Sequence, residues 1–113
     1  QKPQVSMNTS IKGVIVEISE KMLGVAAVVE NKKIIGIITD GDLRRMLSKV
    51  DNFASVTAKD IMSVNPKRID ADAMAIDAMD VMELHGISQL LVEENGNYAG
   101  VVHIHDLIKE GII

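Results

Sequence analysis

A first group of polar residues could hold an anion or a sugar. Thr39, Asp40 and Asp42 fall where a strand is expected to end and a helix to begin. Backbone N–H groups at a helix start favour an anion, and a carboxylate accepts hydrogen bonds from two hydroxyl groups at once. These residues are predicted to contact a small-molecule ligand. A local alternative is that Asp42 is only a helix N-cap and Thr39 only a strand residue.

Four basic residues could complete such a site. Arg44 and Arg45 follow on the first helical turn, where an arginine could pair with a phosphate group. Successive helical residues point about 100° apart, so the two cannot face one site equally. Lys67 and Arg68 accompany an expected strand after Pro66, and strand alternation directs only one of them inward. All four are predicted to bind ligand, with a solvated surface charge as the alternative.

A second group contains His103, His105 and Asp106, and its His103 stands where Thr39 stands in the first. On a regular strand the two imidazoles would share a face, as a metal site would require. Two histidines and one aspartate are an incomplete ligand set, however, and the alternation ends where a helix begins at Asp106. We therefore expect no metal. The three residues are predicted to line a second ligand site, with plain surface histidines as the alternative.

No recognisable catalytic centre is present. The chain lacks Cys, its serines lie in no nucleophile motif, and its histidines have no clear third partner. We expect no catalytic residues and no cofactor.

Composition narrows the class of protein. With 113 residues, 47% of them hydrophobic, the chain can bury one compact core. A net charge of −4 and an aromatic content of 2% argue against a nucleic-acid partner, which needs clustered Lys and Arg or stacking aromatics. The apolar stretches are far shorter than the roughly 18 residues that suggest a membrane span. Without Cys or a signal-peptide pattern, the cytoplasm is the expected location, with no membrane partner.

The two polar groups belong to an internal repeat. Residues 24–29 resemble residues 86–91, which lie 62 positions later, and residues 36–43 resemble residues 100–107, which lie 64 positions later. The difference predicts two extra residues in the hairpin of the second copy.

Each copy is predicted to fold as helix, strand, strand, helix. The first helices, over residues 11–23 and 75–85, are each followed by a Gly suited to a left-handed C-cap, Gly24 or Gly86. Short apolar runs then flank a polar turn, which is typical of a β-hairpin. Asp42 or Asp106 is expected to begin the last helix.

The fold class is therefore predicted to be α+β (mixed α/β), with two repeats related by a pseudo-twofold axis. The first repeat spans residues 1–56 and the second residues 57–113, each a small mixed sheet covered by helices. Only the second is preceded by a segment such as residues 59–62. We interpret the first as truncated at Gln1 and expect a cleft between the repeats.

A family resemblance rests on these residues. Residues 36–43, Asp60-Ile61-Met62, Pro66 and His85-Gly86-Ile87 resemble a tandem pair of cystathionine-β-synthase (CBS) domains over almost the whole chain. Residues 39–45 and 103–107 are in turn similar to the C-terminal half of arabinose 5-phosphate isomerases. In that family a sugar-isomerase (SIS) domain precedes the CBS pair and makes the precursor of the lipopolysaccharide sugar Kdo. That domain is absent from this sequence.

The resemblance implies a regulatory function. Thr39 and Asp42 would hold the ribose hydroxyls of a nucleotide, while His103 departs from Thr and could suit a sugar acid or a different nucleotide. We expect a sensor of a nucleotide or nucleotide-sugar, such as the activated Kdo nucleotide, that shifts an attached SIS isomerase domain within a homodimer or tetramer. The alternative is a ligand-free dimerisation module.

Overall fold

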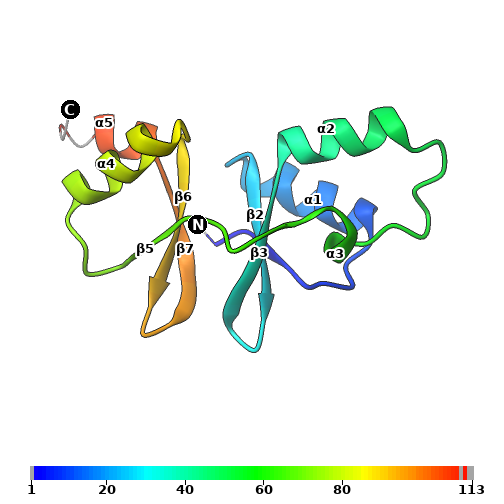
Figure 1. Ribbon diagram of the computed structural model, residues 1–113, viewed down its shortest axis with the longest axis horizontal. Helices are drawn as coiled ribbons and strands as arrows, with labels where there is room; N and C mark the ends of the chain where they lie inside the picture. The colour runs from blue at the N-terminus through cyan, green and yellow to red at the C-terminus, as the bar shows by residue number, and fades with distance from the viewer. Residues whose placement is uncertain (1, 110, 112–113) are drawn as a thin grey trace.

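The computed structural model describes residues 2–109 and 111. The first repeat contains β1 (Gln4–Val5), α1 (Ile11–Lys21), β2 (Val25–Glu30), β3 (Lys33–Thr39) and α2 (Asp40–Lys49). A connecting segment, residues 57–64, carries α3 (Ala58–Ile61) and β4 (Ser63–Val64). The second repeat contains β5 (Arg68–Asp70), α4 (Ala75–His85), β6 (Gln89–Glu94), β7 (Asn97–His103) and α5 (Ile104–Lys109). The repeats lie side by side along the long axis with their hairpins toward the centre (Figure 1).

Two small mixed sheets confirm the predicted fold class. One has the strand order β1-β2-β3-β4 and the other β5-β6-β7. In each, the first strand pairs in parallel with the second, which forms an antiparallel hairpin with the third. Thr39 pairs with Val25, and His103 pairs with Gln89. Thr39 and His103 thus end equivalent strands, each followed directly by a helix.

The helices and strands of the second repeat begin 64 positions after their counterparts in the first repeat. The prediction of a longer hairpin in the second copy was therefore wrong. The closing pairs, Glu30 with Lys33 and Glu94 with Asn97, enclose turns of equal length. The misalignment arose at the helix ends, because α1 is capped by the left-handed Met22 (φ 59°) and not by Gly24. Its counterpart 64 positions later is Gly86 (φ 62°), which caps α4 as predicted.

Three apolar clusters hold the molecule together. One lies under the helices of the first repeat and a second under those of the second repeat. The third joins the two hairpins and consists of Ala27, Ile34, Leu91 and Tyr98. Ala27 and Leu91 are equivalent positions, as are Ile34 and Tyr98, so the sheets meet around a pseudo-twofold axis.

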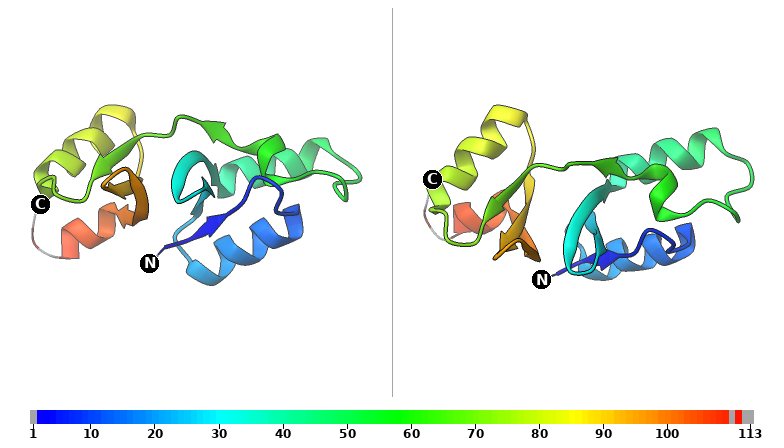
Figure 2. Two further views of the ribbon diagram at one scale, coloured as in Figure 1. Left: turned by 90° about the horizontal axis from the view of Figure 1, so that it is seen from below. Right: turned by 60° about the horizontal axis from the view of Figure 1, so that its bottom comes forward.

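The connecting segment packs on the first repeat, although the sequence assigned it to the second. β4 pairs with β3, and the Ala58 N–H donates to the Thr9 carbonyl oxygen at 2.9 Å. Gly36 is needed here, because a Cβ atom at this position would lie 2.7 Å from the Met62 Sδ atom. After β4 the chain crosses to β5 (Figure 2). The boundary after residue 56 stays a prediction.

Candidate functional site

The turn at Thr39 is a reciprocal capping box at the start of α2. The Thr39 Oγ1 atom accepts a hydrogen bond from the Asp42 N–H at 3.1 Å, and the Thr39 N–H donates to Asp42 Oδ2 at 2.9 Å. Thr39 is therefore the N-cap, and the helix begins at Asp40, not at Asp42 as predicted. The prediction was wrong because the Asp42 side chain reaches back from the first helical turn.

The remaining oxygen of Asp42 is paired with Arg45. Arg45 Nη2 lies 2.6 Å from Asp42 Oδ1, and the side chains are 66% and 16% exposed respectively. Ion pairs this exposed contribute at most about 1 kcal/mol to stability. A ligand hydroxyl could therefore replace Arg45 at Oδ1 at low cost. Arg44 and Asp40 are exposed beside this pair.

The turn at His103 has the same plan with different atoms. The His103 N–H donates to Asp106 Oδ2 at 3.0 Å, and the His105 N–H donates to His103 Nδ1 at 3.0 Å. His103 Nδ1 thus accepts a hydrogen bond from an N–H of the first turn of α5, as the Thr39 hydroxyl accepts one from the first turn of α2.

The two imidazoles do not share a strand face, because β7 ends at His103 and α5 begins at Ile104. Instead the rings of His103 and His105 stack, with centroids 4.7 Å apart and planes 14° from parallel. Asp106 does not begin the helix either; it lies on the first turn, as Asp42 does. Within residues 2–109 and 111, no three His, Cys, Asp or Glu side chains are grouped as a metal site would need.

Gln89 brings the two turns to the same end of the molecule. Its Nε2 atom donates to the Leu23 carbonyl oxygen at 3.0 Å, and Gln89 itself pairs with His103. A Cβ atom at Gly24 would lie 3.2 Å from Gln89 Nε2 and 3.4 Å from Asp40 Oδ2. Gln89 was not predicted from the sequence, where its only signal is an amide within an apolar strand.

Lys67 and Arg68 differ in their surroundings. Lys67 is exposed, whereas Arg68 is half-buried. Arg68 Nη1 lies 3.2 Å from Glu93 Oε2 and 3.5 Å from the Ile34 carbonyl oxygen, and Nε donates to Pro66 at 3.2 Å. Arg68 therefore joins strands of both repeats, in addition to its predicted contact with a ligand.

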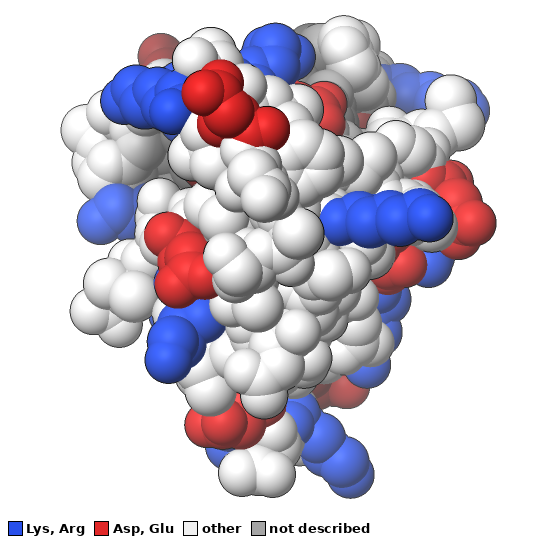
Figure 3. All heavy atoms as spheres, turned by 90° about the vertical axis from the view of Figure 1, so that its right-hand side faces the viewer, with Lys and Arg blue, Asp and Glu red and all other residues white. Residues whose placement is uncertain are grey.

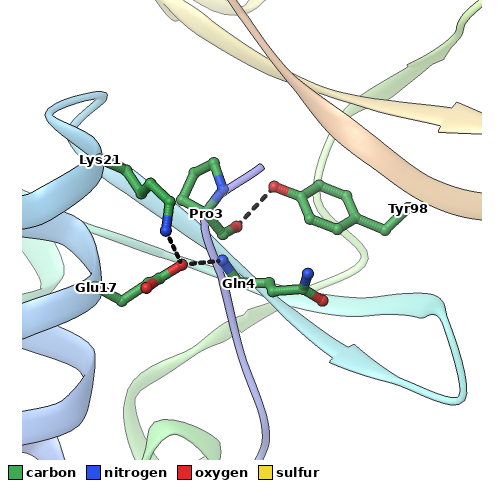
Figure 4. Close-up of polar contacts among 5 residues, drawn as sticks. All are labelled: Pro3, Gln4, Glu17, Lys21 and Tyr98. Atoms are coloured by element: carbon green, nitrogen blue, oxygen red, sulfur yellow. Dashed lines mark hydrogen bonds and ion pairs between the residues drawn. The ribbon is translucent and has the colours of Figure 1, made fainter. Parts of the chain in front are cut away.

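The N-terminal strand is fixed by polar contacts on both sides (Figure 4). Glu17 Oε2 accepts from the Gln4 N–H at 2.9 Å and lies 3.2 Å from Lys21 Nζ. On the other side, the hydroxyl of Tyr98 donates to the Pro3 carbonyl oxygen at 2.6 Å. Burial, with a smaller effect of the Glu17 charge, raises the pKa of Tyr98 above its usual value.

Two hollows lie away from the predicted ligand-binding residues. One, of about 260 Å³, is lined by residues of both repeats, including Lys2, Lys32 and Tyr98. The other, an apolar groove of about 210 Å³, lies on the second repeat between β5, the start of α4 and α5. We call it the second-repeat groove.

Charged side chains are mixed on the end formed by the first repeat. Lys and Arg alternate with Asp and Glu around an uncharged centre, with no continuous basic area among the described residues of this face (Figure 3). In the part of the chain that the structure describes, no helix has the length and apolar character to cross a bilayer.

The structure is a tandem-repeat module. Its two repeats, each a β-hairpin with helices, pack around a pseudo-twofold axis with their capped turns at one end. The model of the CBS domain family matches residues 2–49 and again residues 58–112. The chain therefore belongs to the CBS domain family and is a tandem pair.

Individual relatives narrow this further. Arabinose 5-phosphate isomerase KdsD of Francisella tularensis is 45% identical over 109 residues, covering 95% of this chain and 33% of the relative. The chain spans about a third of the length of the curated relatives it matches. This chain is thus homologous to the CBS region of KdsD.

Solved structures show the same fold. The CBS domain protein NE2398 superimposes with a TM-score of 0.87 at 21% identity, covering 100% of this chain and 89% of that one. A CBS domain protein from Pyrobaculum aerophilum, complexed with AMP, has a TM-score of 0.81 at 23% identity, covering 95% and 85%.

Proposed function

We propose that this chain is the nucleotide- or nucleotide-sugar-sensing regulatory region of a cytoplasmic arabinose 5-phosphate isomerase of the Kdo and lipopolysaccharide pathway. The observation that carries the proposal is the 45% identity to KdsD over 95% of the chain. The AMP complex of a protein with the same fold supports a nucleotide as the class of ligand. Catalysis belongs to a SIS domain elsewhere in the parent protein.

Ligand binding is assigned to the surface where the turns at Thr39 and His103 lie at the same end of the two repeats. On one side, a sugar hydroxyl takes the place of Arg45 at Asp42 Oδ1, while Thr39 and Asp40 contact the ligand beside it. The freed Arg45, with Arg44, is then available to a phosphate group. His103, His105 and Asp106 line the other side. Lys67 and Arg68 follow Pro66 at the start of β5, and the Arg68 guanidinium lies farther along the sheet, at Glu93 and the Ile34 carbonyl oxygen. Two arginines at the start of α2 favour a phosphorylated ligand over a neutral sugar.

Regulation requires the ligand to prefer one arrangement of the two repeats. A ligand that contacts the turns at Thr39 and His103 simultaneously has this property, because the turns belong to different repeats. The change in their relative position would then alter the pose of the isomerase domain within a homodimer or tetramer.

Thermal unfolding against a nucleotide panel tests the proposal. AMP, CMP and CMP-activated sugars are added in turn, and a ligand at 100 times its Kd adds about 2.7 kcal/mol, which raises the Tm by several degrees. If no member of the panel raises the Tm, the proposal fails.

A second candidate function is a dimerisation module without a ligand. Its support is the apolar surface on the outer helices, where Val16 is 46% exposed, Leu47 43%, Leu84 79% and Ile108 46%. Sedimentation of the wild type and of Leu84→Glu separates the two functions. A dimer that Leu84→Glu dissociates, in a chain that binds no nucleotide, favours dimerisation alone.

A further inference from the structure

The second-repeat groove corresponds, position by position, to the surface that α3 covers on the first repeat. Six apolar residues of its wall each lie 64 positions after a buried residue of the first repeat's core. The apolar wall of the groove includes Ile69, Ala75, Ala78, Val92, Val102 and Leu107. Their counterparts are Val5, Ile11, Val14, Val28, Ile38 and Leu43, all buried in one cluster with Ala58.

The exposed fractions of the wall residues differ between the repeat that α3 covers and the repeat that it does not. Val28 and Ile38 are each 0% exposed, whereas their counterparts Val92 and Val102 are only half-buried. Ala58, which lies over the first repeat's surface, is also 0% exposed. The apolar wall is therefore closed in the first repeat, whereas in the second it is partly open at Val92 and Val102, and Ala78 and Leu107 remain buried.

The two sheets also differ at their edges. β4 adds to the edge of β3 through the pairs of Gly36 with Val64 and Ile37 with Ser63. The equivalent edge of β7, at Gly100 and Val101, has no strand beside it among the described residues. Both the groove and this edge thus lack what the connecting segment provides to the first repeat.

We propose that the second-repeat groove and the edge of β7 bind the eight residues that directly precede residue 1 in a longer parent chain. The connecting segment ends at Val64, directly before Asn65, which is the counterpart of residue 1. By the repeat, a segment equivalent to residues 57–64 would lie directly ahead of residue 1, with no linker between. The curated relatives are about three times as long as this chain, which leaves room for it.

The expected occupant has the chemistry of the connecting segment. It is a single helical turn with a small residue at the position of Ala58, large aliphatic residues at those of Ile61 and Met62, and a short strand. Ala58 contacts the loop before α1 through the Thr9 carbonyl oxygen. Ala73, the counterpart of Thr9, offers the same backbone group at the groove.

Such docking would fix the polypeptide ahead of residue 1 on the second repeat, while β1 belongs to the first. A domain attached at this point would then contact both repeats and respond to their relative position. The inference rests on the part of the proposed function that places this chain in a longer protein.

Grafting tests the proposal without knowledge of the parent sequence. A second copy of residues 57–64 (TAKDIMSV) is placed directly before residue 1 of the 113-residue chain. The graft is expected to raise the Tm by roughly 4 °C or more and to slow amide exchange at Gly100 and Val101, the residues beside the groove that the added strand would cover. The matched control carries Ile61→Asp in the added copy only, and it should show neither effect. Because the ungrafted chain is the reference, loss of folding cannot imitate the result.

Two outcomes would overturn the proposal. One is a graft that leaves both the Tm and the exchange of the Gly100 and Val101 amides unchanged. The other is a dimer of the ungrafted chain that the graft dissociates, because the groove would then be a contact between two copies. Neither readout involves a nucleotide, so the sensor function stands or fails separately.

Discussion

The hydroxyl of Tyr98 donates a hydrogen bond of 2.6 Å to the carbonyl oxygen of Pro3, a residue 95 positions earlier in the chain. The backbone N–H of Tyr98 also donates to the Lys32 carbonyl oxygen at 2.7 Å. One residue of the second hairpin is thus bonded to the first strand and to the first hairpin. Tyr98 is 4% exposed, so these bonds are shielded from water.

Replacing Tyr98 with Phe should weaken the contact between the repeats. The ring still fills its place in the apolar cluster, but the Pro3 carbonyl oxygen loses its donor. Leaving a buried acceptor unsatisfied costs about 1–3 kcal/mol of unfolding free energy. Urea unfolding followed by circular dichroism measures the loss, and an unchanged midpoint would contradict the assigned role.

The same residue predicts a loss of stability at high pH. Burial raises the pKa of Tyr98 above its ordinary value of 10.0. Above about pH 10 the unfolded chain releases this proton while the folded chain retains it, so the free energy of unfolding falls by up to about 1.4 kcal/mol per pH unit. Below that pH the contribution is fully present. Tyr98→Phe lacks this group, and its stability should fall less steeply between about pH 10 and pH 11.

The sequence predicted most elements of the fold, because local patterns determine them. The repeat, the hairpins and the ends of β3 and β7 at Thr39 and His103 follow from apolar runs and turn residues. The features that the sequence did not predict depend on contacts between residues that are distant in the chain. The position of Gln89 beside Gly24 arises only when the repeats pack together, and the packing of residues 57–64 arises from contacts with Thr9 and β3 that local patterns do not show.

The helix ends illustrate the same limit on a smaller scale. A glycine near the expected end of each helix suggested equivalent caps, yet the left-handed position in the first repeat is occupied by Met22. The helix α1 ends at the cap in which the Met22 N–H donates to the Ile18 carbonyl oxygen, two residues before the nearest glycine. In the same way, Asp42 and Asp106 resemble helix starts in sequence, because a carboxylate that reaches back three residues looks like an N-cap.

Substituting the left-handed cap residues Met22 and Gly86 should change the free energy of unfolding in opposite directions. A non-glycine residue in the left-handed region costs roughly 1 kcal/mol. Met22 is 85% exposed, so Met22→Gly removes that cost with little loss of packing and should raise the free energy of unfolding. Gly86→Ala should lower it by a similar amount, since an added Cβ atom meets nothing within 4 Å. Denaturant unfolding of both variants checks the sign, and two shifts in the same direction would refute the explanation.

His103 should be replaceable by Thr but not by Ala. Thr restores the hydroxyl cap seen at Thr39, whereas Ala leaves the N–H of His105 without its acceptor. Loss of an N-cap costs about 1 kcal/mol. The two variants are compared by thermal unfolding, and equal stability of His103→Thr and His103→Ala would show that the imidazole does not cap α5.

Asp42 offers a test that separates capping from ligand contact. Asp42 and Asp60 make the same backbone bond, at 2.9 Å, to Thr39 and Thr57 respectively. Asp42→Asn and Asp60→Asn should therefore lose similar, small amounts of stability, below about 1 kcal/mol, because the Asn side-chain oxygen still accepts the backbone N–H. Only Asp42→Asn should also lose affinity for the nucleotide that stabilises the wild type, measured by calorimetry. Equal affinities of the two variants would leave Asp42 a purely structural residue.

The packing of α3 and β4 on the first repeat also bears on how such a molecule can be divided. A half-length chain ending before Thr57 would retain both strands of its hairpin and still lack the lid over Val28 and Ile38. The unit that was duplicated and the unit that packs together are therefore offset by one segment, because the first repeat is covered by residues that follow it in the chain.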